Sequence, residues 1–93
     1  MFEIILHPAI KRDMKSLPKN IVRRIRQCIA DLQTNPYLPN RTEKLSGYRD
    51  VYRLKVHQSY RMAYHVDMDA RQITIVSVGT RENFYDRVRR RLR

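Results

Sequence analysis

The sequence predicts a small α+β fold in which helices pack on an antiparallel β-sheet. Three patterns indicate it: apolar and polar residues alternate over residues 51–66, apolar residues recur at helical spacing over 18–35, and residues 73–78 are mostly apolar. Alternation with period two is typical of a strand with one buried face, whereas recurrence every three or four residues is typical of an amphipathic helix. A chain of this length is expected to form one domain, residues 1–93.

The N-terminal half is predicted to form one strand followed by two helices. Residues 2–6 are short, apolar and rich in strand formers. A helix then opens at Pro8, because proline suits the first helical position, and Pro18 separates it from a longer helix that ends before Pro36. The longer helix carries an apolar stripe that is expected to face the core: Ile21, Ile25, Cys28, Ile29 and Leu32. Cys28 is the single cysteine and is predicted to be a buried free thiol.

The C-terminal half is predicted to be mainly sheet. Residues 36–50, with two prolines and a glycine, are expected to form a connecting loop. The hairpin over residues 51–66 follows, and then a strand over residues 72–80 and a helix over residues 82–92. The predicted order is β-α-α-β-β-β-α, with the two N-terminal helices packed on one face of the sheet and a further helix at the C-terminus.

The hairpin is predicted to gather cationic side chains on one face. Its even positions hold most of the large apolar side chains, and its odd positions carry the basic ones: Arg53, Lys55, Arg61 and His65. Opposed residues of an antiparallel pair project to the same face, and a slip by one residue exchanges the faces. For the apolar residues at even positions of both strands to share one face, the numbers of two opposed residues must sum to an even number. This parity predicts a three-residue tip, residues 57–59, with Val56 opposite Tyr60.

The formal net charge of +11 indicates a polyanionic partner. Nucleic acid is the first expectation and an acidic protein the second. A membrane surface comes third, because the sequence has no long basic amphipathic helix with an aromatic face. Residues 1–6 are too short for a signal peptide, and no segment approaches transmembrane length. We therefore expect a cytoplasmic protein without a membrane partner.

The sequence predicts no metal site and no small-molecule cofactor. The three histidines, His7, His57 and His65, lack the flanking carboxylates and close spacing of a zinc site, and the two glycines form no phosphate-binding loop. RNA, however, carries its own nucleophile, the 2′-hydroxyl next to the scissile phosphate. A cationic surface with a positioned base is therefore suited to cleave RNA, because it stabilises the charge that develops on the phosphorane.

An ordered series of motifs resembles the RelE/ParE toxin superfamily. The series comprises Lys44–Gly47, Tyr52–Lys55, Tyr60–Tyr64, Val78–Glu82 and Tyr85. It covers residues 43–86 with one short gap, and the preceding β-α-α segment agrees in order and length. The resemblance implies a RelE-like fold in a bacterial or archaeal type II toxin–antitoxin system. For RelE-type members it also implies a ribosome-dependent, metal-independent endoribonuclease that cuts mRNA by 2′-hydroxyl attack.

Carried over position by position, the resemblance implies a catalytic set: Arg53, Lys55, Arg61, Arg81 and Tyr85. Arg53 stands where the family pattern has a lysine, which keeps the charge but cannot readily act as a base. The general base stays open among Lys55, Tyr85 and His65. A further set is expected to bind RNA or the ribosome: Lys44, Arg49, His57 and His65.

Two other functions stay open on the same fold. One is a ParE-type inhibitor of DNA gyrase, and the other is a non-catalytic nucleic-acid-binding or regulatory module. The five retained polar positions, one of them conservatively changed, favour the nuclease. The resemblance also implies a cognate, RelB-like antitoxin with an acidic toxin-binding segment, beside mRNA and the ribosome as partners.

The predicted C-terminal helix has a narrow apolar stripe, and five of the last seven residues of the chain are arginine. Like charges four residues apart destabilise a helix. With its arginines on the faces outside that stripe, this helix is predicted to dock weakly and to carry Tyr85 into or out of the site. An acidic antitoxin helix is then expected to displace it. A structural interpretation stays open for each of two residues of the predicted catalytic set. For Tyr85 it is a place in the core. For Arg81 it is a bond to Glu82 or Asp86 at the start of this helix.

Overall fold

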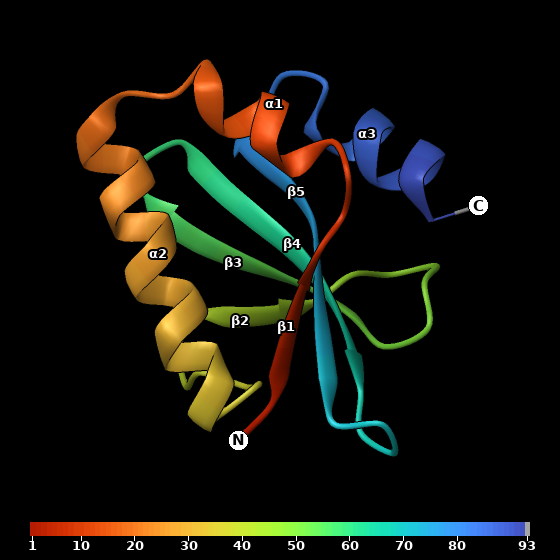
Figure 1. Ribbon diagram of the computed structural model, residues 1–93. Coiled ribbons are helices and arrows are strands. Elements are labelled where there is room, and N and C mark those ends of the chain that lie inside the picture. Colours follow the sequence, from red (N-terminus) through yellow and green to blue (C-terminus); the bar gives the residue numbers. More distant parts are fainter. Residues whose placement is uncertain (93) are drawn as a thin grey trace.

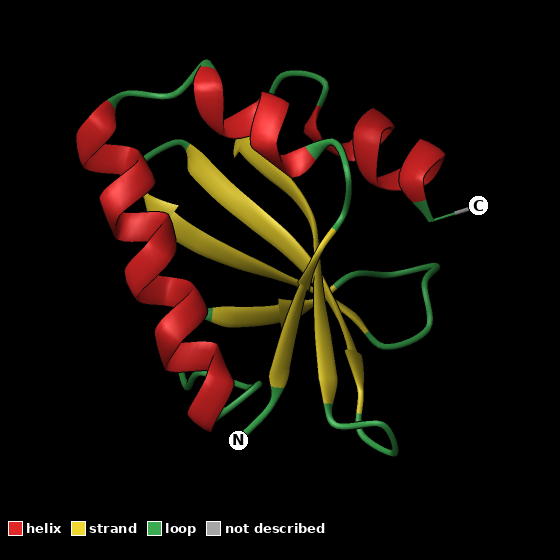
Figure 2. Ribbon diagram, in the orientation of Figure 1, coloured by secondary structure: helices red, strands yellow, loops and turns green. Residues whose placement is uncertain are grey.

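A computed structural model describes residues 1–92, and Arg93, one of the five C-terminal arginines, lies outside the described residues. The described chain forms three helices and five strands (Figures 1 and 2). The helices are α1 (Ile10–Lys15), α2 (Lys19–Thr34) and α3 (Phe84–Arg91). The strands are β1 (Glu3–Leu6), β2 (Thr42–Lys44), β3 (Val51–His57), β4 (Tyr60–Asp67) and β5 (Gln72–Thr80). The predicted α+β class is confirmed.

The five strands form one sheet in the order β1-β5-β4-β3-β2. Strand β1 runs parallel to β5, with Glu3 opposite Gln72 and Leu6 opposite Ile75, while the other neighbours are antiparallel. The sheet is therefore mixed, and the prediction of a purely antiparallel sheet was wrong in this respect. An apolar pattern predicts a strand but carries no information on its direction, and β1 pairs with a strand almost seventy residues away in the chain.

Residues 36–50 were predicted to form a loop, but they contain the edge strand β2. Its residues pair with β3, with Glu43 opposite Arg53 and Lys44 opposite Tyr52. The segment is polar and only three residues long, so no alternation revealed it. The order is therefore β-α-α-β-β-β-β-α, with one strand more than predicted.

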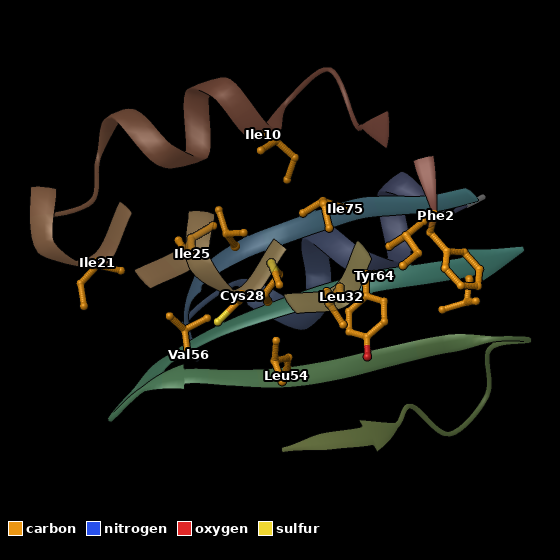
Figure 3. Packing of buried hydrophobic residues seen from close by; sticks show 14 residues of the cluster. Phe2, Ile10, Ile21, Ile25, Cys28, Leu32, Leu54, Val56, Tyr64 and Ile75 are labelled. Atoms are coloured by element: carbon orange, nitrogen blue, oxygen red, sulfur yellow. The ribbon is translucent and has the colours of Figure 1, made fainter. Parts of the chain in front are cut away.

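The two faces of the sheet carry separate cores. Figure 1 shows α2 on one side of the sheet, and α3 with the loop after β2 on the other. The apolar stripe of α2, including the buried Cys28, packs together with Ile10 of α1 and the inner residues of the sheet, as Figure 3 shows. This confirms that the two N-terminal helices share one core. On the opposite face, Phe84 and Val88 of α3 pack against Ala63.

The hairpin keeps the predicted faces by a different turn. Leu54 pairs with Met62 and Lys55 with Arg61, as parity required. The tip, however, is a two-residue turn in which His57 pairs with Tyr60, and a bulge lies between Lys55 and His57. The prediction of a three-residue tip was therefore wrong. A two-residue turn alone would exchange the faces, but the extra residue of the bulge restores the register along the rest of the hairpin.

Tyr64 joins the hairpin to the loop that follows α2. Its fully buried hydroxyl donates a hydrogen bond to the Pro36 carbonyl at 2.7 Å and lies 3.0 Å from the Thr42 hydroxyl. Burial raises the pKa of the Tyr64 phenol from 10.0 to about 12, while the hydrogen bond with Thr42 acts in the opposite direction. The fold therefore holds this side chain in its neutral form.

We expect Tyr64 to make the protein less stable at alkaline pH. Its folded pKa is raised, so its contribution is complete below pH 10.0 and is lost as pH rises to about 12. At about 1.4 kcal/mol per pKa unit, the loss is about 2–3 kcal/mol. Denaturant unfolding of the wild type and Tyr64→Phe, below and above this range, measures it. The expected result is a smaller alkaline loss in the variant, and an equal loss in both proteins would contradict the assignment.

None of the helices within residues 1–92 is long and apolar enough to cross a membrane.

Candidate active site

The strand pairing brings three basic side chains onto one surface, here called the cationic face, which consists of Arg53, Lys55 and Arg61. Lys55 lies opposite Arg61, and Arg53 lies opposite Ala63 on β4. Directly opposed residues project to the same side of a sheet. The cationic face is thus on the side covered by α3, because Ala63 packs against that helix. The parity of the hairpin predicted this grouping correctly.

Tyr85 reaches the cationic face from the first turn of α3. Its phenol oxygen accepts a hydrogen bond from Arg61 Nη1 at 3.0 Å and another from Arg53 Nη1. The neighbouring Phe84 is fully buried, and its ring meets the Tyr85 ring edge-on with 5.1 Å between centroids. Tyr85 itself is 38% exposed. The alternative in which Tyr85 belongs to the core is therefore wrong, because Phe84 occupies that place.

The two arginines change the acidity of this tyrosine. Burial alone would raise the pKa of the Tyr85 phenol, but the hydrogen bonds from Arg53 and Arg61, together with their charges, lower it below 10.0. The hydrogen bond between Arg53 and Tyr85 also raises the pKa of the Arg53 guanidinium, which stays charged. A phenol that ionises more readily beside two permanent cations can accept a proton while the cations bind phosphate oxygens.

Glu43 belongs to this site and was missed by the sequence analysis. Its carboxylate lies 2.5 Å from Arg53 Nη2, and both line a small hollow together with Arg41, Lys55 and Arg61. The ion pair is largely exposed on the Glu43 side, so its main effect is to orient Arg53. The sequence could not reveal this pair, because Glu43 stands on the polar strand β2 that was predicted to be a loop.

Two members of the predicted catalytic set, Lys55 and Arg81, make no hydrogen bond to Tyr85 in the part of the chain that the structure describes. Lys55 is exposed at the rim of the hollow, opposite Arg61. Arg81 is exposed in the turn between β5 and α3. Asp86, one of the alternative partners considered for Arg81, bonds to Arg89 at 2.7 Å instead. Within the predicted catalytic set, the hydrogen bonds thus join Tyr85 to Arg53 and Arg61.

The residues predicted to bind RNA or the ribosome are more scattered. Lys44 is exposed on β2, and His57 is half-buried beside the hairpin tip. Arg49 and His65 line a pocket of about 370 Å³. His65 lies two residues from Ala63 on β4, the residue opposite Arg53, and so stands on the same side of the sheet as the cationic face. Among the described residues, the hydrogen bonds of Tyr85 come from Arg53 and Arg61, and none joins it to His65, one candidate for the general base.

Metal ligands are not assembled in the part of the chain that the structure describes. Within residues 1–92, no group of three or more His, Cys, Asp or Glu side chains is arranged to hold a metal ion.

The single thiol, Cys28, accepts a hydrogen bond from Arg41 Nη2 at 3.1 Å. Burial raises the pKa of this thiol, and the charge of Arg41 acts in the opposite direction.

Comparison with solved structures defines the class of protein. A mutant of the Escherichia coli toxin RelE in the free state matches with a TM-score of 0.81 and 20% identity, covering 99% of this chain and 98% of that chain. An archaeal RelE–RelB complex from Pyrococcus horikoshii OT3 matches with a TM-score of 0.73 and 27% identity, covering 87% of this chain and 96% of that chain. The fold is therefore RelE-like.

Sequence comparison gives the family. A protein of Methanocaldococcus jannaschii that bears the name RelE1 is 30% identical over 86 residues, which cover 90% of this chain and 94% of the relative. Residues 4–89 match the family described as ParE-like toxin of type II bacterial toxin–antitoxin system. The chain belongs to this family and is a RelE-like toxin, which confirms the resemblance found in the motifs.

Proposed function

We propose that this toxin is a ribosome-dependent, metal-independent endoribonuclease that cleaves mRNA and so inhibits translation. The observation that carries the proposal is the Tyr85 phenol, which accepts hydrogen bonds from Arg53 and Arg61 on an open, cationic surface. A base with lowered pKa beside preorganised cations is what cleavage by an internal 2′-hydroxyl requires. The net charge of +11 favours binding to RNA.

In the proposed reaction, the Tyr85 phenolate takes the proton from the 2′-hydroxyl of the RNA. The 2′-oxygen then forms a bond to phosphorus, while the bond from phosphorus to the 5′-oxygen breaks. Arg53 and Arg61 neutralise the charge that grows on the non-bridging oxygens. Lys55 supplies a proton to the leaving 5′-oxygen, and Arg81 binds a neighbouring phosphate. The products are a 2′,3′-cyclic phosphate and a free 5′-hydroxyl.

The proposed partners are a cognate antitoxin, mRNA and the ribosome. The P. horikoshii relative and a Methanococcus jannaschii relative were both solved as RelE–RelB complexes. We propose that a RelB-like antitoxin with an acidic segment neutralises this chain in the same way, since a strongly basic toxin surface attracts acidic side chains. Action on translating ribosomes would take place in the cytoplasm.

The proposal is tested by incubating the purified protein with mRNA-programmed ribosomes and, in parallel, with DNA gyrase. We expect cut mRNA on ribosomes and unchanged supercoiling by gyrase. Inhibition of gyrase without RNA cleavage would replace the proposal with the ParE-type function. Inactivity in both assays, with RNA binding retained, would indicate a non-catalytic module.

The pH dependence of cleavage follows from the lowered pKa of Tyr85. A general base acts in its deprotonated form, so the cleavage rate should first rise with pH, and this rising limb should follow the pKa of the phenol. Because Arg53 and Arg61 lower that pKa, the rise should occur at a lower pH than an ordinary tyrosine allows. Single-turnover cleavage by the wild type and by Arg53→Gln measures this, and the rising limb should move to higher pH in the variant. Identical pH profiles would exclude Tyr85 as the base.

A further inference from the structure

Strand β5 continues beyond the end of its partner β1. The pairing with β1 ends at Ile75, whereas β5 runs on to Thr80. Side chains bind the backbone groups that β1 does not reach. Arg91 Nη1 donates to the Val76 carbonyl at 2.9 Å, and Arg87 Nη2 donates to the Val78 carbonyl at 3.3 Å. Two arginines of α3 thus take the place of a neighbouring strand at this part of the edge.

Both arginines converge on one buried carboxylate, Asp13 of α1. Asp13 is only 5% exposed, which is unusual for an aspartate unless it is paired. Arg91 binds it in bidentate fashion, with distances of 2.6 Å and 3.0 Å to the two carboxylate oxygens. Arg87 Nη1 lies 3.7 Å from Oδ1, and the Val78 amide donates to Oδ2 at 3.5 Å. A single side chain therefore connects α1, β5 and α3.

The backbone at Gly79 makes room for this arrangement. A Cβ atom at this position would lie 2.5 Å from Arg87 Nη2, and the φ angle of +151° is one that other residues rarely adopt. The path of Arg87 to Val78 and Asp13 therefore depends on the absence of a side chain at position 79. The helical pattern placed Arg87 and Arg91 on faces outside the apolar stripe of α3, and on those faces Asp13 and the edge of β5 hold both side chains inward.

The same contacts determine where Tyr85 lies. Arg87 and Arg91 are four residues apart on α3, and Tyr85 stands two residues before Arg87 on the same short helix. Phe84 and Val88 give α3 a narrow apolar contact, which leaves room for rotation and sliding, whereas a bidentate ion pair fixes direction. Without the carboxylate, two guanidinium groups would remain close together with little solvent, and they would repel each other. The helix would then be expected to shift.

From this geometry we infer that Asp13 is a positioning residue that fixes α3, through Arg87 and Arg91, so that the Tyr85 phenol meets Arg53 and Arg61. Asp13 does not touch the cationic face and takes no part in the proposed reaction. Its consequence for RNA cleavage rests on the proposed function. Its consequence for the environment of Tyr85 does not, so the two can be tested separately.

The experiment compares the wild type, Asp13→Asn and a matched control, Asp86→Asn. Asp86 lies on α3 beside Tyr85, but it pairs only with the exposed Arg89 among the described residues. Ultraviolet difference titration, with Tyr85→Phe as the reference for each protein, reports the ionisation of this phenol. Cleavage on programmed ribosomes is measured in parallel. Folding of each variant is checked by circular dichroism.

In Asp13→Asn we expect the Tyr85 pKa to rise toward that of an ordinary tyrosine and cleavage to fall by about 10²-fold, as expected for a displaced catalytic group. Asp86→Asn should leave both unchanged. If Asp13→Asn does not fold, Arg91→Lys serves instead, because it keeps the charge but loses the bidentate fork, and the same shift in Tyr85 titration is expected. An unchanged Tyr85 titration in a folded variant would overturn the inference. If the wild type cuts no RNA but the Tyr85 titration is still shifted in the variant, the inference stands and the proposed function is rejected.

Discussion

Replacing Tyr85 with phenylalanine is expected to lower the rate of mRNA cleavage by about 10²–10⁴-fold, the usual contribution of a positioned general base. The substitution removes one oxygen, which is the atom that accepts hydrogen bonds from Arg53 and Arg61. The ring and the helix remain, because the core contact of this turn is made by Phe84. Single-turnover cleavage on programmed ribosomes measures the loss.

Tyr37→Phe provides a matched control for this prediction. Tyr37 is similarly exposed, at 40%, and its ring packs on Tyr52, which lies outside the cationic face. The control should cleave at the wild-type rate. Wild-type activity in Tyr85→Phe would assign the base to another group, and Lys55, at the rim of the same hollow, would then be the next residue to replace.

Replacing the neighbouring Phe84 with alanine is expected to act on stability, lowering the free energy of unfolding by about 3–5 kcal/mol. Phe84 is fully buried and, with Val88, makes the apolar contact of α3 with Ala63. Such a loss is a large part of the total stability of a small domain, which is about 5–15 kcal/mol. Equilibrium denaturation measures the change, with Tyr85→Phe as a control that should be close to the wild type.

The two adjacent substitutions thus separate structure from chemistry. Phe84→Ala should reduce stability and, through the released helix, activity as well. Tyr85→Phe should reduce activity alone. A stable Phe84→Ala protein would show that the polar contacts of Arg87 and Arg91 with Asp13 are sufficient to hold α3, and that the apolar contact adds little.

The sequence predicted the part of the site that depends on local periodicity. Arg53, Lys55 and Arg61 fall on one face because the hairpin alternates with period two, and the bulge near Val56 preserved that alternation although the turn differed from the prediction. The resemblance to toxins added Tyr85, which the helical pattern alone left between core and surface. Arg53 and Tyr85 are more than thirty residues apart, so only the fold shows that they bond.

Long-range electrostatic pairs could not be predicted in the same way. Asp13 and Arg91 are separated by 78 positions, and each lies in a segment that reads as a solvated helix face. Their pairing depends on where β1 ends beside β5, which is a property of the assembled sheet. The place of Glu43 in the site could not be predicted for a related reason, because its strand is defined by pairing with β3 and has no apolar pattern of its own.

The proposed function requires that the Tyr–Arg cluster on the cationic face activates the 2′-hydroxyl of mRNA. The decisive measurement is single-turnover cleavage of an mRNA whose codon in the ribosomal A site carries one 2′-deoxynucleotide immediately before the scissile phosphate, compared with the all-ribose mRNA. We expect the all-ribose mRNA to be cut to a 2′,3′-cyclic phosphate and a 5′-hydroxyl, and the deoxy substitution to abolish cleavage at that position. Cleavage of the deoxy-substituted mRNA at the same phosphate would rule out this role, because the nucleophile would then be water.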